Sequence, residues 1–82
     1  MSELDDRRIR WRLRRGMREL DLMLEHFHAA RAGSMTPEQK NTLAKLLECE
    51  DDILWDWLNG RSRPDSTEFE EMVNAIRGHA FD

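Results

Sequence analysis

The sequence has one cysteine, no tyrosine, two prolines and four glycines that stand apart from one another. Cys49 has no partner for an internal disulfide, and this use of cysteine is typical of a reducing compartment. The isolated glycines exclude a glycine-rich loop of the kind that cradles phosphate groups. No apolar run approaches the roughly 18–20 residues that a membrane-spanning helix requires. We therefore expect a protein that does not insert into membranes and has no dinucleotide-binding motif of its own.

Groups that carry out catalysis are also scarce. Each of the four serines lies in an expected terminus, loop or helix cap, where hydrogen bonding to the backbone explains it. His26 and His28 lie about 200° apart around a helix, so they cannot bind one metal ion together. A zinc site that includes Cys49 is the alternative. Without a nucleophile–base pair or a metal site, we expect that the chain is not an enzyme.

Apolar residues recur at helical spacing, and no strand-like alternation is present. We expect a first helix over about residues 4–15, with Ile9 and Leu13 on its buried side and an interruption at Gly16. A second helix should end near Gly33. Its apolar stripe has spacings of three and four and consists of Met17, Leu20, Met23, Leu24 and Phe27.

Three further helices follow. Thr36, Pro37 and Gln39 predict a helix start with a capping box. A fourth helix should have Asp51 or Asp52 as its cap and should end at Gly60, and a fifth should begin at Asp65 or Ser66. The sequence therefore predicts an all-α fold, a compact five-helix bundle of short helices, in which residues 1–82 make a single domain.

Charge is distributed unevenly. Residues 1–18 carry seven arginines against three acids, whereas the remaining residues carry fourteen acids against six bases. Arg8, Arg12 and Arg15 fall in one sector of the first helix, and Trp11 flanks them. This pattern predicts either an exposed recognition surface or a solvated charged face with the indole in the core. The acidic run at 50–52 can cap a helix or bind basic residues, on a partner or in this chain.

Two sequence blocks carry a resemblance. The run 14–21, Arg-Arg-Gly-Met-Arg-Glu-Leu-Asp, contains the pattern Arg-Gly-x-x-Glu at Arg15, Gly16 and Glu19. By itself it also admits a local Arg15–Glu19 ion pair and a helix-junction glycine. The second block comprises 46–52, Leu-Leu-Glu-Cys-Glu-Asp-Asp, followed by Trp57-Leu58 and Pro64. Together the two blocks resemble the FAD assembly factor family of succinate dehydrogenase, the SdhE or succinate dehydrogenase assembly factor 2 type.

This resemblance implies a five-helix bundle and a chaperone-like activity. A member binds the flavoprotein subunit of succinate dehydrogenase or fumarate reductase and promotes covalent attachment of FAD to it. The bond forms between a histidine of that subunit and the 8α-methyl carbon of FAD, so the assembly factor needs neither a nucleophile nor a flavin-binding motif. The implied partner-binding residues are those of the motif and its neighbours: Arg15, Gly16, Glu19, Arg8, Trp11, Arg14 and Met17.

Each motif residue has an expected role. Gly16 would let the two backbones approach closely, Arg15 would offer a planar fork to a carboxylate or carbonyl group, and Glu19 would orient a basic or imidazole group. We expect a bacterial cytoplasmic protein that is monomeric when free. One alternative is an antitoxin-like protein-binding module. Nucleic-acid binding through the arginines is another, although the overall acidity argues against a stable nucleic-acid complex.

Overall fold

The computed structural model describes residues 2–31 and 33–80, with side chains described for residues 7–31 and 33–78. These residues form five helices and no strand, which confirms the predicted all-α fold. The helices are α1 (Ser2–Arg12), α2 (Arg18–Arg31), α3 (Pro37–Leu46), α4 (Asp51–Leu58) and α5 (Thr67–Ala80). Within the described ranges, each helix is too short or too polar to span a lipid bilayer.

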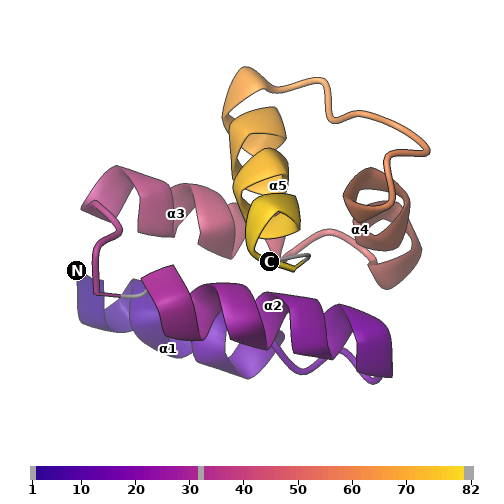
Figure 1. Cartoon of the computed structure of the whole chain (residues 1–82). Coiled ribbons are helices and arrows are strands. Elements are labelled where there is room, and N and C mark those ends of the chain that lie inside the picture. The colour runs from indigo at the N-terminus through magenta and orange to yellow at the C-terminus, as the bar shows by residue number, and fades with distance from the viewer. Residues whose placement is uncertain (1, 32, 81–82) are drawn as a thin grey trace.

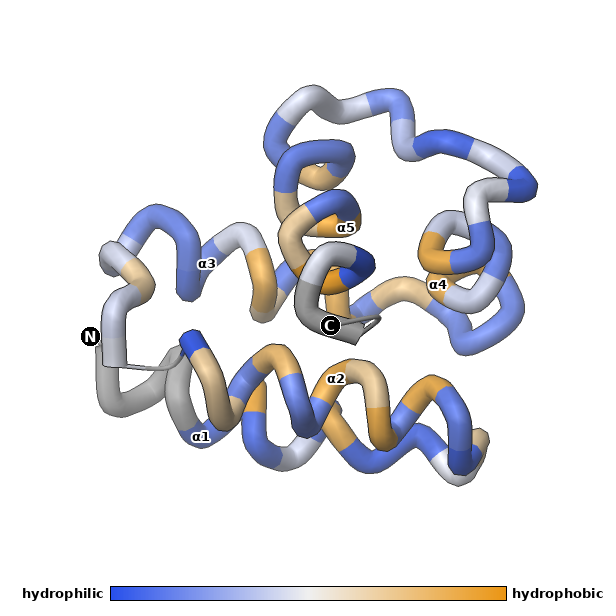
Figure 2. The backbone as a smooth tube through the Cα atoms, in the orientation of Figure 1, coloured by the Kyte–Doolittle hydropathy of each residue, from blue (hydrophilic) through white to orange (hydrophobic). Residues whose placement is uncertain are grey.

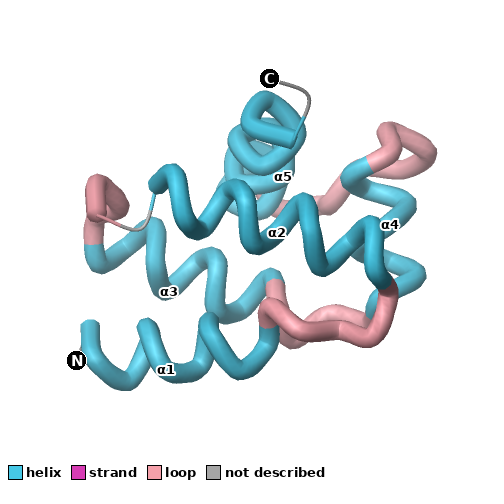
Figure 3. Tube along the Cα trace, turned by 60° about the horizontal axis from the view of Figure 1, so that its bottom comes forward, coloured by secondary structure: helices cyan, strands magenta, loops and turns pink. Residues whose placement is uncertain are grey.

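The helices pack as a compact body with extents of 33 × 26 × 24 Å. α2 packs against α5, and α1 packs against α3 (Figure 1). In the view of Figure 3, α3 lies between α1 and α2, and α4 lies at the end where the chain passes from α1 to α2. The segment that carries the Arg-Gly-x-x-Glu pattern therefore lies beside the turn that joins α3 to α4.

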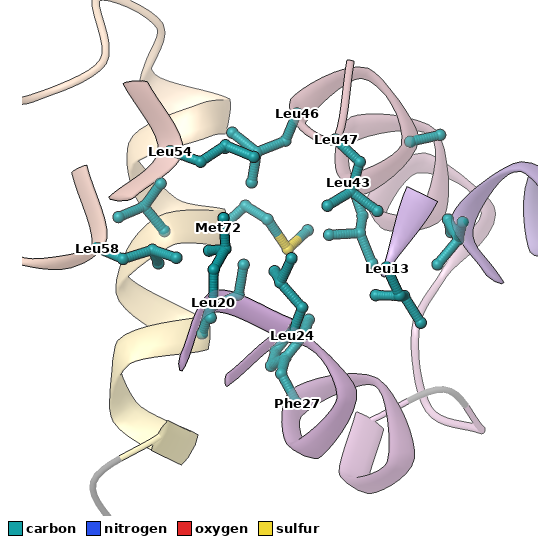
Figure 4. Packing of buried hydrophobic residues seen from close by; sticks show 14 of the residues in the cluster. Leu13, Leu20, Leu24, Phe27, Leu43, Leu46, Leu47, Leu54, Leu58 and Met72 are labelled. Atoms are coloured by element: carbon teal, nitrogen blue, oxygen red, sulfur yellow. The ribbon is translucent and has the colours of Figure 1, made fainter. Parts of the chain in front are cut away.

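The core is built from the apolar faces of these helices, which appear as orange segments alternating with blue along α2 and α5 (Figure 2). Met72 points from α5 into the centre of the cluster, where leucines of α2, α3 and α4 surround it (Figure 4). Leu20, Leu24 and Phe27 are buried, and Met17 and Met23 are half-buried at the edge. The predicted stripe of the second helix is therefore confirmed. Burial of one such leucine or phenylalanine stabilises a fold by about 1.5–3 kcal/mol.

Side chains cap the starts of α3 and α5. The Thr36 hydroxyl accepts a hydrogen bond from the Gln39 N–H at 3.1 Å, and the Gln39 side chain accepts one from the Thr36 N–H at 2.9 Å. This is the predicted capping box. The Ser66 hydroxyl accepts a hydrogen bond from the Phe69 N–H at 3.3 Å, so Ser66 is the residue that caps α5.

The end of α4 is a Schellman motif. Gly60 has a φ of +76°, its N–H donates to the Trp57 carbonyl at 3.1 Å, and the Arg61 N–H donates to the Asp56 carbonyl at 2.9 Å. These two bonds satisfy carbonyl groups that the last helical turn would otherwise leave without a partner. The predicted stop at Gly60 is therefore confirmed.

Two predicted boundaries were wrong. The first helix ends at Arg12 and not at about Arg15, because the Arg15 N–H bonds to the Asp21 carboxylate instead of continuing the helical ladder. The expected cap of the fourth helix, Asp51 or Asp52, lies inside α4, and the N-cap is Glu50, whose side chain makes no capping bond. The carboxylate of Asp51 is bonded to Arg15, which the local pattern of acids did not indicate.

Candidate functional site

The motif loop, residues 13–17, joins α1 to α2 and is held by the side chain of Arg15. The guanidinium donates hydrogen bonds to the carbonyl oxygens of Leu47 and Cys49, at the end of α3 and in the turn that follows. Its Nε donates to Asp51 Oδ1 in the first turn of α4 at 2.6 Å, and its Nη1 donates to the Arg12 carbonyl at 3.3 Å. Only 11% of this side chain is exposed, so Arg15 serves as an internal clamp.

The backbone of the motif loop is fixed from the other side by α2. The Arg15 N–H donates to Asp21 Oδ1 at 2.7 Å, and the Asp21 N–H donates to the Met17 carbonyl at 2.8 Å. Met17 is half-buried against the core. Between these anchors, Gly16 has a φ of +84° and is exposed, and a Cβ built on it meets no heavy atom within 4 Å. Gly16 therefore faces open space at the tip of a firmly held loop.

Exposed side chains lie on both sides of Gly16 along the chain. Trp11, on α1, is 83% exposed, which is unusual for so large an apolar ring. Arg14 is exposed, and Glu19 is exposed in the first turn of α2. These four residues are exposed within the stretch 11–19, and we call Trp11, Arg14, Gly16 and Glu19 the open face. The alternative in which the indole is tucked into the core was wrong.

Two arginines of α1, Arg8 and Arg12, lie against Glu48 in the turn between α3 and α4. Arg8 Nη2 lies 3.5 Å from Glu48 Oε2, and Arg12 Nη1 lies 3.4 Å from Glu48 Oε1. Together with the Arg15–Asp51 pair, these contacts place the basic segment against the end of α3 and the start of α4. Of the acidic run at 50–52, Asp51 thus binds a basic residue of the chain itself, whereas Glu48, which binds Arg8 and Arg12, precedes that run. Arg15 pairs with Asp51 and not with Glu19, which makes no ion pair with any side chain that the structure describes.

Cys49 lies beside this clamp. Burial raises the pKa of its thiol, and the negative charge of Glu48 raises it further, whereas the Arg15 guanidinium opposes the shift. The thiol therefore ionises less readily than an ordinary cysteine and is a weaker nucleophile. Among the residues whose side chains are described, no three histidine, cysteine or acidic groups lie close enough to hold a metal ion.

The open face lies apart from the depression of about 460 Å³ between α2, α3 and α5, because none of the residues that line that depression belongs to the motif loop. Small-molecule sites are concave and bury most of their ligand. An exposed loop with an indole beside it is instead typical of a surface that another protein covers, where tryptophan and arginine contribute most to binding.

Two residues near the motif loop were not predicted from the sequence: Leu22, which is exposed, and Asp21, which accepts a hydrogen bond from the Arg15 N–H. Leu22 is 47% exposed and lies three residues after Glu19, on the same side of α2. Its signal in the sequence was that it falls out of phase with the buried stripe of Leu20 and Leu24. Asp21 ends the run that carries the family resemblance, but its bond to the Arg15 N–H could not be predicted, because it depends on the course of the backbone at Arg15.

These features define a small all-helical protein in which a firmly held loop between α1 and α2 exposes Gly16 to open space. Comparison with known proteins identifies it further: the Sdh5 family, described as flavinator of succinate dehydrogenase, matches residues 7–80. The chain belongs to this family, as the sequence resemblance indicated.

Three relatives illustrate the match, and each is named FAD assembly factor SdhE. The protein of Coxiella burnetii is 40% identical over 74 residues, which cover 90% of this chain and 90% of the relative. That of Mannheimia succiniciproducens is 41% identical and covers 93% and 88%, and that of Yersinia pseudotuberculosis is 38% identical and covers 92% and 86%. No solved structure is significantly similar to the chain.

Proposed function

We propose that this chain binds the flavoprotein subunit of succinate dehydrogenase, or of fumarate reductase, and promotes covalent attachment of FAD to that client. The family is described as flavinator of succinate dehydrogenase, and the relatives are named as FAD assembly factors. The observation that carries the proposal is the open face. Along the chain, an exposed indole precedes and an exposed carboxylate follows a glycine on which an added Cβ meets no atom within 4 Å.

The chain acts by binding and not by bond making. The carbon–nitrogen bond forms on the client, between its histidine and the 8α-methyl carbon of FAD, and that reaction requires the two atoms in near-attack geometry. A protein that binds the reactive client conformer more tightly than other conformers raises its population. A tenfold rise requires a differential affinity of about 1.4 kcal/mol. One well-placed surface loop is sufficient for an effect of this size.

Each residue of the open face has a role in this complex. The client covers the Trp11 indole, which is the type of side chain that dominates binding energies. Gly16 allows the client backbone to approach without a side chain between the two chains. Glu19 accepts a hydrogen bond from a basic or imidazole group, and Arg14 contributes a guanidinium at the edge. Met17 anchors the loop to the core, because its side chain is half-buried against the core residues.

The pairing of the arginines favours a protein client over nucleic acid. Arg8 and Arg12 lie against Glu48, and Arg15 is bonded to Asp51, so these charges are partly neutralised within the fold. Phosphate binding depends on cations that are available to replace condensed counterions. In the proposed function, Arg8 contacts the client at the rim of the interface. The free chain is a monomer in the bacterial cytoplasm.

The proposal is tested by co-expressing the flavoprotein subunit with Trp11→Ala or Glu19→Ala variants. Covalent flavin is then measured by in-gel fluorescence of the denatured client. Each variant should reduce the fluorescence, because each removes a group that only the client contacts. Glu25→Ala is the matched control, since Glu25 is an exposed acid on the same helix, outside the open face. Wild-type fluorescence with both folded variants would refute the assignment of the open face.

A further inference from the structure

The donors of Arg15 are almost fully used within the chain. A guanidinium has five N–H donors. Four hydrogen bonds leave this side chain, one from Nε, two from Nη1 and one from Nη2. A client carboxylate that used the guanidinium as a planar fork would have to displace these bonds. Arg15 is thus poorly suited to direct contact, although it belongs to the motif.

Two carboxylates hold this residue from different helices. Asp51, in α4, accepts from the side chain at 2.6 Å, and Asp21, in α2, accepts from the backbone N–H at 2.7 Å. The carbonyls of Leu47 and Cys49 add the end of α3. The motif loop is therefore tied to three helices through one residue. The next residue along the chain is Gly16, which faces open space.

We propose that Arg15 is a positioning residue for the client-binding loop, and that Asp21 and Asp51 position it in turn. The proposal rests on the proposed function, since it explains how Gly16 and Glu19 are presented to the client. A loop that is already ordered loses less conformational freedom on binding than a mobile one. Loss of either carboxylate should therefore weaken client binding by about tenfold, although neither carboxylate lies on the open face.

The test uses two carboxylate variants, a rescue variant and a control in the full chain. Asp21→Ala and Asp51→Ala each remove an acceptor. Asp21→Asn keeps an oxygen that can accept the Arg15 N–H, so it should restore the wild-type loop. Asp56→Asn is the control, because Asp56 forms an exposed ion pair with Arg61 at 3.8 Å on the same helix as Asp51.

Two readouts are taken at a temperature at which every variant is folded by circular dichroism. The first is the amide resonance and hydrogen exchange of Gly16 and Glu19 in the free chain. The second is the affinity for the purified flavoprotein subunit by titration calorimetry. We expect both alanine variants to shift these amides, to speed their exchange and to lose about tenfold in affinity, while Asp21→Asn and Asp56→Asn stay within about threefold of wild type.

Unshifted amides in both alanine variants would overturn the proposal. Wild-type affinity despite shifted amides would also overturn it, because the loop's shape would then not matter for binding. A general loss of stability would disturb amides throughout the core and would not be rescued by Asp21→Asn. If the wild-type chain itself does not bind the flavoprotein subunit, the proposed function fails. In that case the amides of the free chain alone decide whether the carboxylates position the loop.

Discussion

Replacement of Gly16 separates the conformational requirement of the motif loop from the close approach of a client. Gly16 has a φ of +84°, and an added Cβ meets nothing within 4 Å, so the cost of Gly16→Ala inside the chain is the left-handed backbone alone. That cost is about 1–2 kcal/mol. For a domain of this size it lowers the melting temperature by about 5–15 °C.

Gly60 provides the matched control. Its φ is +76°, and its added Cβ would lie 3.3 Å from Arg77 Nη2, the far end of a flexible side chain. Gly60→Ala should therefore destabilise the chain about as much as Gly16→Ala. Thermal unfolding by circular dichroism measures both changes, and titration with the flavoprotein subunit below both melting temperatures measures binding. We expect binding to be lost in Gly16→Ala alone.

A third variant, Gly16→Asn, completes the comparison. Asparagine adopts the left-handed conformation more readily than alanine, so this variant should recover part of the lost stability. It still places a side chain in front of the loop, and client binding should remain weak. If Gly16→Asn folds and binds the client as wild type does, the glycine is needed for its backbone conformation and not for close approach. The interface assigned to Gly16 would then be incorrect.

Three further predictions concern the Arg15 clamp, the start of α3 and the Cys49 thiol. Arg15→Ala removes four hydrogen bonds. The partial exposure of Asp51 limits the contribution of its ion pair, so we expect the free energy of unfolding, measured by urea denaturation, to fall by about 2–4 kcal/mol. A fall below about 1 kcal/mol would contradict the clamp. Thr36→Ala breaks the capping box and should cost about 1 kcal/mol in the same assay, whereas an unchanged midpoint would contradict the capping role. Because the pKa of Cys49 is raised above its ordinary 9.0 by burial, the fold holds the thiol proton more tightly than the unfolded chain does. The free energy of unfolding should therefore fall as the pH rises above 9.0. Iodoacetamide should react more slowly with the thiol in the folded chain than in the chain unfolded by urea. Equal reaction rates would refute the raised pKa.

The sequence predicted those parts of the fold that depend on local pattern. The apolar spacing on α2, the capping box at Thr36 and the glycine stop at Gly60 each follow from residues within one or two turns of one another. The end of α1 and the cap of α4 were both misplaced because of bonds made by Arg15. Its N–H bonds to the Asp21 carboxylate, which ends α1 early, and its guanidinium bonds to groups 32 to 36 residues away, which have no local signature.

The sequence pattern left open whether Trp11 is exposed or lies in the core, and the structure shows that Trp11 and Gly16 are both exposed. The sequence could not show that Arg15 faces inward, because a charged side chain next to a glycine is compatible with either orientation. Only the fold brings the carbonyls of Leu47 and Cys49 within reach of the guanidinium. The use of Arg15 as a direct contact to the client therefore stays a prediction, and the clamp argues for an indirect role.

The attachment of α1 has a consequence for its dynamics. Of the described side chains in residues 7–17, only Ile9 and Leu13 are buried in the core, and the contacts of Arg8 and Arg12 with Glu48 are partly exposed ion pairs. Exposed ion pairs weaken as ionic strength rises, whereas the leucine packing of α2 and α5 does not. Salt should therefore loosen the helix that carries Trp11 before it affects the rest of the bundle. Affinity for a client would then depend on ionic strength even where the client contributes no charge.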